Sequence, residues 1–269
     1  MPTTVEDLRR FKHERRRFVM LTAYDCLLAR AFDEAGVPLI LVGDTLGIFA
    51  LGHETTIPVT MDDMVHHCRA VSRSVGDALV VGDLPFGSYH ESLAQGIHNA
   101  VRLVKEGGVA MVKLEGPEHE LIEAISSKGV PVMGHLGLTP QSFHAMGGHR
   151  VQARTEAAVA ELVDAALRLE AAGACSMVIE GVPTEAARRV TEAVDVPTIG
   201  IGAGPHCDGQ VLVGPEMLGL STGRRPKFAK PYADLATAAV VAAKSFADDV
   251  DSGSYPDAEH SYDWAIKAG

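Results

Sequence analysis

The chain has 269 residues, close to the roughly 250 that are typical of a single (β/α)₈ barrel. Its formal net charge of −11 argues against nucleic-acid or anionic-membrane partners, because there is no excess of Lys and Arg to neutralise phosphates. No run approaches the roughly 18 apolar residues of a membrane span, and Cys26, Cys68, Cys175 and Cys207 form no Cys-x-x-Cys pair. We therefore expect a cytoplasmic protein with reduced cysteines.

Residues 5–17, which end in the basic run Arg15-Arg16-Arg17, predict an amphipathic helix with the arginines on its solvated surface. Beyond it, short apolar runs alternate with helical patterns such as Ser92–Glu106 and Ala158–Ala172, which is the βαβ rhythm of a parallel sheet. The apolar runs predict eight strands, at Val19–Asp25, Leu39–Asp44, Leu79–Leu84, Met111–Glu115, Val132–Leu136, Met177–Glu180, Thr198–Ile201 and Val211–Val213.

The predicted strands are almost continuously hydrophobic, which fits strands that are covered on both faces. Strand order cannot be deduced from the sequence, so a doubly wound sheet is an alternative to the barrel. Eight βα units with polar groups after nearly all the strands favour a (β/α)₈ TIM barrel in the α/β class. We expect a single domain over residues 1–269, with the N-terminal helix before the barrel and a C-terminal helical extension and tail at about 232–269, the helix being Tyr232–Asp249.

Two long connections interrupt the rhythm, Gly47–Thr60 after the second strand and Thr139–Glu156 after the fifth. Both are candidates for a lid or substrate loop.

Polar side chains recur at or near the C-terminal ends of the predicted strands. In a barrel these ends converge on one mouth, so residues far apart in sequence become neighbours around one small substrate. The residues concerned are Asp44, Asp83, Lys113, Glu115, His135 and Glu180.

Asp44, Asp83 and Glu115 supply hard oxygen donors of the kind that Mg²⁺ prefers, and each of the two aspartates follows a glycine that would let a ligand come close. The alternative is that a strand-end Asp caps the following loop or helix. Lys113 lies two residues before Glu115, so both side chains point the same way. Its ammonium could hold a substrate carboxylate or a developing enolate oxygen, or simply pair with Glu115.

Glu180 ends an apolar run, which suits a general base, although a salt bridge to a neighbouring cation is the alternative. His135 is expected to orient or hydrogen-bond the substrate, or else to be a packing residue. Together these groups predict a site in which Mg²⁺ stabilises the enolate of a 2-oxo acid while Glu180 removes the proton from the adjacent carbon. A carbon–carbon bond would then form or break.

The chain resembles the ketopantoate hydroxymethyltransferase family over about residues 5–262. The stretches Gly-His-Leu-Gly-Leu-Thr-Pro-Gln at 134–141 and Gly-Ala-Gly at 202–204 followed by Asp-Gly-Gln at 208–210 are highly specific in combination. Further matches are Leu-Thr-Ala-Tyr-Asp at 21–25, Leu-Val-Gly-Asp-Thr-Leu-Gly at 41–47, Pro-Val-Thr at 58–60, Asp-Leu-Pro-Phe at 83–86, Val-Lys-Leu-Glu-Gly at 112–116 and Pro-Lys-Phe-Ala-Lys at 226–230.

The resemblance implies transfer of the one-carbon unit of 5,10-methylenetetrahydrofolate to 3-methyl-2-oxobutanoate, giving 2-dehydropantoate for pantothenate and coenzyme A synthesis. It also implies a homo-oligomer, often a decamer. Its residue pattern implies a Mg²⁺ site at Asp44, Asp83 and Glu115, oxo-acid contacts from Asp44, Thr45, Asp83 and Lys113, and Glu180 as proton acceptor.

Two other functions compete with this prediction. A Mg²⁺-dependent lyase or mutase of the isocitrate lyase and phosphoenolpyruvate mutase type would use similar enolate chemistry, but the chain lacks the Lys-Lys-Cys-Gly-His-type loop typical of those enzymes. A non-catalytic barrel that binds a metabolite is the third possibility. The combination of Lys113, Glu115 and Glu180 argues against it, because binding alone requires no base.

Overall fold

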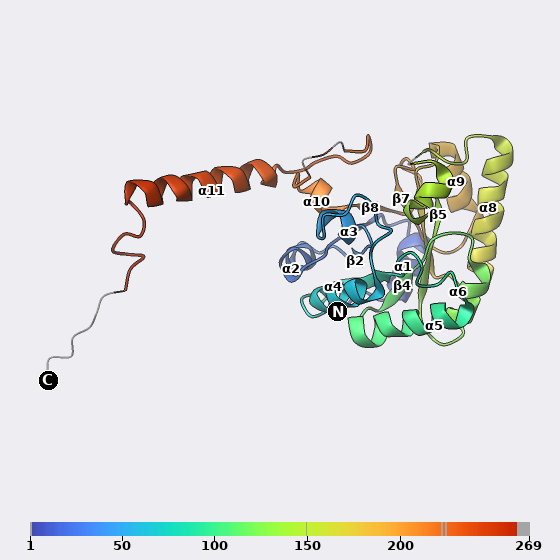
Figure 1. The fold of residues 1–269 in the computed structure, drawn as a ribbon. Helices are drawn as coiled ribbons and strands as arrows, with labels where there is room; N and C mark the ends of the chain where they lie inside the picture. Colours follow the sequence, from blue (N-terminus) through green and yellow to red (C-terminus); the bar gives the residue numbers. More distant parts are fainter. Residues whose placement is uncertain (1, 149, 222, 224, 263–269) are drawn as a thin grey trace.

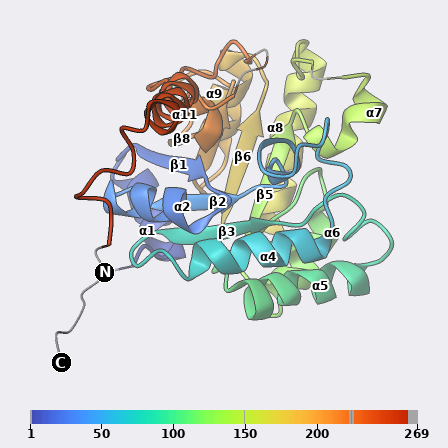
Figure 2. The same ribbon diagram turned by 60° about the vertical axis from the view of Figure 1, so that its left-hand side comes forward.

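The computed structural model describes residues 2–148, 150–221, 223 and 225–262, which form a closed eight-stranded parallel barrel with helices around it (Figures 1 and 2). Each strand pairs with its neighbour in sequence, and β1 closes the ring on β8 with Met20 opposite Val211. This closure excludes the doubly wound sheet and confirms the (β/α)₈ prediction.

All eight predicted strands are present. They are β1 (Phe18–Thr22), β2 (Leu39–Val42), β3 (Leu79–Asp83), β4 (Met111–Lys113), β5 (Val132–Gly137), β6 (Ser176–Glu180), β7 (Thr198–Ile201) and β8 (Gly209–Leu212).

Helices follow most strands and most of them pack against the outside of the barrel, whereas the last helix extends away from it (Figure 1). The helices before β6 are α1 (Val5–His13), α2 (Cys26–Glu34), α3 (Leu46–Phe49), α4 (Met61–Ser72), α5 (Leu93–Arg102) with its π-helical continuation η1 (Leu103–Gly107), α6 (His119–Ser126), the 3₁₀ turn η2 (Pro140–Ser142), α7 (Phe143–Met146) and α8 (Glu156–Ala171). After β6 come α9 (Thr184–Ala193), α10 (Gly214–Met217) and α11 (Leu235–Ser252).

Two apolar layers hold the barrel together. Inward-facing residues such as Met20, Leu41 and Val178 fill its interior, and outward-facing residues such as Ile40 and Val112 pack under the helices. The near-continuous hydrophobicity of the strands is thereby explained, because both faces are buried.

Helix α1 packs its buried Leu8 and Phe11 against the barrel interior. A capping box between Thr4 and Asp7 fixes its first turn. Lys12 extends from it to donate hydrogen bonds to the Val196 carbonyl and the Asp208 carboxylate, close to where β7 and β8 begin. The helix therefore covers the end of the barrel opposite the strand C-termini.

Several predicted boundaries are wrong. The first strand ends at Thr22, because Asp25 instead caps α2 by accepting hydrogen bonds from the backbone N–H groups of Leu27 and Leu28. Helix α1 ends at His13, so the basic run lies in the following turn, where Arg15 has a positive φ of 53°.

The two long connections contain short helices. Gly47–Thr60 begins within α3, and Thr139–Glu156 holds η2 and α7 before α8 starts. At the C-terminus α11 starts and ends three residues later than predicted. The tail is described to residue 262, and the remainder of the predicted tail lies outside the described residues. Among the described helices, none is long and apolar enough to cross a membrane.

Candidate active site

A small cavity of about 50 Å³ opens among the C-terminal ends of the strands. Since one water needs roughly 10–15 Å³ of such volume, the cavity has room for about four waters or a small ligand. All the predicted site residues line it. The lining comprises Thr22, Leu41, Asp44, Thr45, Asp83, Lys113, Glu115, His135, Pro140, Val178, Glu180, Ile201, Val211 and Val213.

Lys113 and Asp83 form a buried ion pair in the lining of this cavity. They lie opposite each other on β4 and β3, and Lys113 Nζ is 2.6 Å from Asp83 Oδ1. Burial raises the pKa of Asp83, and Lys113 only partly offsets that effect. Burial acts to lower the pKa of Lys113, but the surrounding carboxylates outweigh it and the net shift is upward. Lys113 is therefore a fixed positive charge inside the barrel, and its partner is Asp83 rather than Glu115.

Asp44 lies beside this pair with only 2% of its surface exposed. Its backbone N–H donates to Asp83 Oδ2 at 3.1 Å, which fastens the loop after β2 to the end of β3. Burial raises the pKa of Asp44 well above its usual range, and the charges of Asp83 and Glu115 raise it further. The positive charge around Asp44 is thus too small to offset the burial of its carboxylate form.

His135 bridges two carboxylates. Its Nδ1 lies 3.4 Å from Glu115 Oε1 and its Nε2 lies 3.3 Å from Glu180 Oε2, although neither nitrogen has hydrogen-bond geometry. Burial and Lys113 act to lower the pKa of His135, but the carboxylates outweigh them and raise it to about 9. Burial acts to raise the pKa of Glu115, but His135 and Lys113 outweigh it and the net shift is downward. A protonated His135 therefore joins Glu115 to Glu180.

The electrostatics of the cavity fit a divalent cation. Among the described residues that line the cavity, four carboxyl groups, Asp44, Asp83, Glu115 and Glu180, are accompanied by two cations, Lys113 and His135. Among the described residues, no three acidic, imidazole or thiol side chains form a ready-made metal cage. Mg²⁺ usually keeps several waters and binds through one or two carboxylates, so the buried Asp44 with its raised pKa provides the kind of ligand that this ion requires.

Thr45 reaches the cavity from the loop after β2. Its hydroxyl forms a 2.8 Å hydrogen bond with the buried Tyr24 hydroxyl, which accepts another from Thr22 at 2.8 Å. This chain of hydroxyls fixes the Thr45 Oγ1 beside Asp44. This role of Tyr24 was not predicted from the sequence.

Gln141 and Tyr89 support the acidic cluster, which consists of Asp44, Asp83, Glu115 and Glu180. Neither role was predicted. The Gln141 amide donates to Asp44 Oδ2 and to the Leu84 carbonyl, both at 2.9 Å, while its backbone N–H donates to Glu115 Oε2 at 2.9 Å. Tyr89 donates to Gln141 Oε1 at 2.7 Å. Gln141 belongs to a specific motif, but its partners lie far away in sequence. It ties the start of the 139–156 connection to the acidic cluster.

The glycines before the two aspartates have different roles. A Cβ at Gly43 would lie 2.8 Å from Thr45 Oγ1 and 3.3 Å from Asp83 Oδ2, so a side chain there would crowd the site. A Cβ at Gly82 would instead lie 3.0 Å from Cys68 Sγ and 3.1 Å from Val109. The prediction of close ligand approach is therefore wrong for Gly82, which allows helix α4 to pack against β3.

The family profile and the sequence relatives of this chain carry names for the same activity. The profile of the family described as ketopantoate hydroxymethyltransferase matches residues 2–258. The 3-methyl-2-oxobutanoate hydroxymethyltransferase of Thermobifida fusca is 52% identical over 261 residues, covering 96% of this chain and 93% of the relative. That of Thermoanaerobacter pseudethanolicus is 50% identical over 257 residues, covering 95% and 94%.

Solved structures share the barrel at much lower identity. A phosphonopyruvate hydrolase superposes with a TM-score of 0.60 at 15% identity, covering 98% of this chain and 92% of its own. A 2,3-dimethylmalate lyase of the phosphoenolpyruvate mutase and isocitrate lyase superfamily gives 0.59 at 17% identity, covering 94% and 89%. At such identities the likeness shows the fold alone.

Replacing Gln141 tests its supporting role. Gln141→Leu removes the side-chain hydrogen bonds to the Tyr89 hydroxyl, the Leu84 carbonyl and Asp44 Oδ2, and we expect the free energy of unfolding to fall by about 1–3 kcal/mol. Gln152→Leu is the matched control, because within the described part of the chain that side-chain amide bonds only to the nearby Arg150 carbonyl. Urea denaturation measures both. Equal effects of the two substitutions would contradict the role given to Gln141.

Proposed function

The chain belongs to the ketopantoate hydroxymethyltransferase family, and we propose that it transfers the one-carbon unit of 5,10-methylenetetrahydrofolate to 3-methyl-2-oxobutanoate. Hydroxymethyl transfer in pantothenate synthesis follows from the family. The donor, the enolate route and the residue roles are our proposal. The observation that carries it is the convergence of Lys113, Asp83, Asp44, Glu115 and Glu180 on one small cavity.

The oxo acid would bind against Lys113 and Thr45. Lys113 holds a permanent positive charge at 4% exposure, which suits a substrate carboxylate or an oxygen that gains negative charge during the reaction. The Thr45 hydroxyl, oriented by Tyr24, can hydrogen-bond a substrate oxygen. With Asp44 and Asp83 around it, a small 2-oxo acid would be held in one orientation, with His135 supporting the base.

Asp44, Asp83 and Glu115 would hold Mg²⁺, directly or through water. When bound, this ion would supply positive charge beside the ketone oxygen and so favour the enolate. Asp83 remains paired with Lys113, so Asp44 is the carboxyl group with the most to gain from the ion.

Glu180 would act as the general base. Its carboxylate lies at the end of β6 with 15% of the side chain exposed, and Oε2 would take the proton from C3 of the oxo acid. C3 would then bond to the methylene carbon of the folate as the bond from that carbon to one folate nitrogen breaks. Water would displace the second nitrogen and supply the hydroxyl oxygen, so that tetrahydrofolate leaves with the proton taken by Glu180 and one proton from the water. The imidazolium of His135, 3.3 Å from Glu180, would keep the base oriented before the transfer.

A lyase or mutase function is the second candidate, because enzymes of that superfamily share the barrel. That likeness extends to the fold alone. The sequence relatives at about 50% identity are transferases, which favours the proposed reaction.

A direct assay tests the proposal. The purified chain is incubated with Mg²⁺, 3-methyl-2-oxobutanoate and 5,10-methylenetetrahydrofolate, and 2-dehydropantoate is followed by mass spectrometry. We expect Mg²⁺-dependent product. Turnover of isocitrate or a phosphonate in place of the oxo acid would refute the transferase proposal.

The role of Glu180 can be isolated from the full reaction. Without folate, the native chain should exchange the C3 proton of 3-methyl-2-oxobutanoate for solvent deuterium, as measured by NMR. Glu180→Gln should slow this exchange by about 10²–10⁴-fold, since general-base catalysis contributes that much, while Mg²⁺-dependent binding persists. Exchange at the native rate in Glu180→Gln would rule out this residue as the base.

The affinity for Mg²⁺ should depend on pH through Asp44. Because the pKa of Asp44 is raised, ion binding must displace its proton, so affinity should rise with pH until the carboxyl group is ionised in the free protein. The slope can reach about tenfold per pH unit. Titration calorimetry in two buffers measures the released proton. Asp44→Asn should remove most of this slope, and a pH-independent affinity in the native chain would contradict the assignment.

A further inference from the structure

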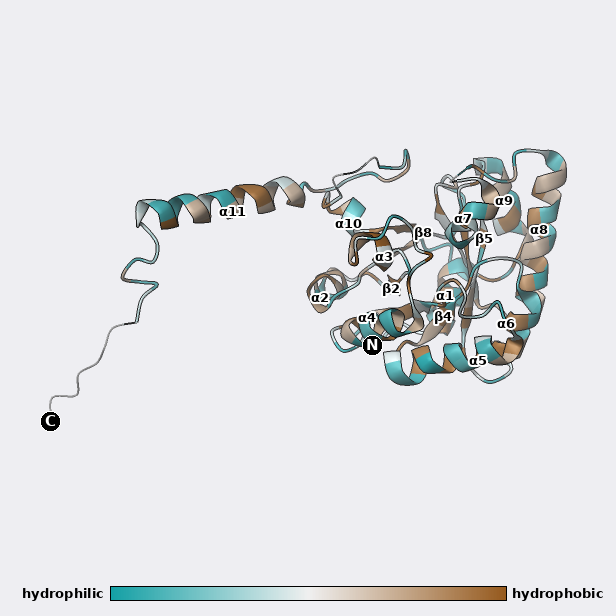
Figure 3. Cartoon of the chain, in the orientation of Figure 1, coloured by the Kyte–Doolittle hydropathy of each residue, from teal (hydrophilic) through white to brown (hydrophobic). Residues whose placement is uncertain are grey.

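A chain of hydrogen bonds links helix α10 to the candidate active site. Helix α10 lies between the end of β8 and the segment that leads to α11 (Figure 3). Its first residue, Gly214, donates its backbone N–H to the Thr22 hydroxyl at the end of β1, at 3.0 Å. A Cβ on Gly214 would collide with the Thr22 carbonyl oxygen. The glycine therefore allows the two elements to approach closely enough for this bond.

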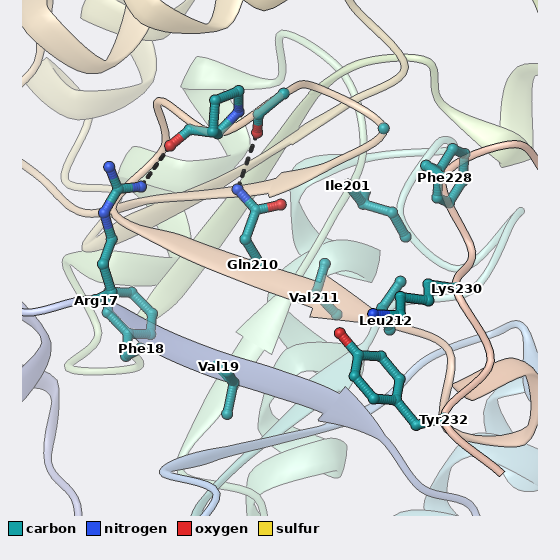
Figure 4. A pocket seen from close by; sticks show the side chains of 13 residues that line it. Arg17, Phe18, Val19, Ile201, Gln210, Val211, Leu212, Phe228, Lys230 and Tyr232 are labelled. Carbon is teal, nitrogen blue, oxygen red and sulfur yellow. Dashed lines mark hydrogen bonds between the residues drawn. The ribbon is translucent and has the colours of Figure 1, made fainter. Parts of the chain in front are cut away.

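Thr22 faces the interior of the barrel. Successive side chains of a strand point to opposite faces, and Val19 on the same strand points outward into a groove between β1 and β8 (Figure 4). Thr22 follows three residues later, so it points inward, where it lines the cavity and is 3% exposed. The Gly214 N–H thus bonds to a hydroxyl that belongs to the mouth of the barrel.

The hydroxyls that follow donate in one direction. A backbone N–H can only donate, so the Thr22 oxygen accepts from Gly214, and its own proton goes to the Tyr24 hydroxyl at 2.8 Å. Burial raises the pKa of Tyr24, so the phenol keeps its proton at neutral pH. Among the described residues, the other hydrogen bond of this phenol is the 2.8 Å bond with Thr45. The Tyr24 proton is therefore donated to Thr45.

Thr45 is left with a proton of its own that faces the cavity. Its oxygen accepts from Tyr24, and within the described part of the chain its hydroxyl makes no other hydrogen bond. Hydrogen bonds in a chain polarise one another, which makes the last hydroxyl a stronger donor. We propose that Tyr24 is a positioning residue that makes the Thr45 hydroxyl a donor to a negatively charged oxygen of the oxo acid. This role rests on the proposed function, because it requires an oxo acid in the cavity.

The direction of the chain matters because acceptors crowd the mouth. Asp44, Asp83 and Glu115 line the same cavity, and an ionised carboxylate can only accept hydrogen bonds. A Thr45 hydroxyl that rotated freely could donate to one of them in place of the substrate. Tyr24 itself does not belong to the cavity lining. Its hydroxyl therefore acts on the substrate through Thr45.

A double-mutant cycle tests whether Tyr24 acts through Thr45. The full-length variants are Tyr24→Phe, Thr45→Val and their combination. The readout is kcat/KM for exchange of the C3 proton of 3-methyl-2-oxobutanoate with solvent deuterium in the presence of Mg²⁺. Tyr24→Phe removes one hydrogen bond and should lower this value about five- to tenfold. In Thr45→Val there is no hydroxyl to position, so adding Tyr24→Phe should cause no further loss.

The control variants separate positioning from a structural effect. Thr45→Ser keeps the hydroxyl, so in that background Tyr24→Phe should again lower the exchange about five- to tenfold. Tyr262→Phe removes a phenol from the exposed tail and should change nothing. Thr22→Val breaks the chain one bond earlier, and it replaces Tyr24→Phe in the cycle if thermal unfolding shows that variant to be unfolded.

The outcomes distinguish this role from the proposed function. With an active native chain, losses that multiply in the double variant, or an unchanged rate in Tyr24→Phe, would overturn the positioning role alone. Absence of exchange in the native chain would refute the proposed function and the positioning role with it.

Discussion

The candidate site depends on an excess of buried negative charge at the mouth of the barrel. Asp44, Asp83 and Glu115 are each no more than 6% exposed, and burial of a carboxylate is costly unless positive charge compensates for it. Lys113 compensates Asp83, and His135 serves Glu115 and Glu180. Asp44 is left with amide donors and a raised pKa. A divalent cation would compensate the remaining negative charge at Asp44. The same cluster of buried carboxyl groups would therefore both bind the metal and hold the base that removes the proton.

Barrel closure makes this concentration of charge possible. The acids come from the ends of β2, β3, β4 and β6, and only the closed ring brings them around one cavity. The register sets Asp83 opposite Lys113 and places Glu180 opposite Gly137 on β5. Behind the cavity an apolar interior, closed at the far end by α1, keeps water out and so strengthens every charge interaction in the mouth.

Much of this arrangement could be predicted from local patterns. Apolar runs located all eight strands, and the polar residues after them identified the cavity lining, because strand ends in a barrel converge. Gln141 and Tyr89 could not be assigned roles, since their partners are distant in sequence. Gly82 was misread because sequence does not reveal which face of a strand a residue occupies. The C-terminal helix was predicted, but its direction was not. That direction depends on hydrogen bonds from the backbone N–H groups of its first turn to the carbonyls of Leu218 and Gly219.

The charge balance at Asp44 is tested most directly by thermal unfolding with increasing MgCl₂, against NaCl at equal ionic strength. Ligand at about 100 times its Kd stabilises by about 2.7 kcal/mol, so the native midpoint should rise by about 5–10 °C. Asp44→Asn removes a buried carboxyl group whose raised pKa lowers the stability of the fold at neutral pH, and it keeps an acceptor for Gln141. The variant should therefore melt higher than the native chain without metal and respond little to Mg²⁺. A native midpoint indifferent to Mg²⁺, or a lower metal-free midpoint in Asp44→Asn, would contradict the account.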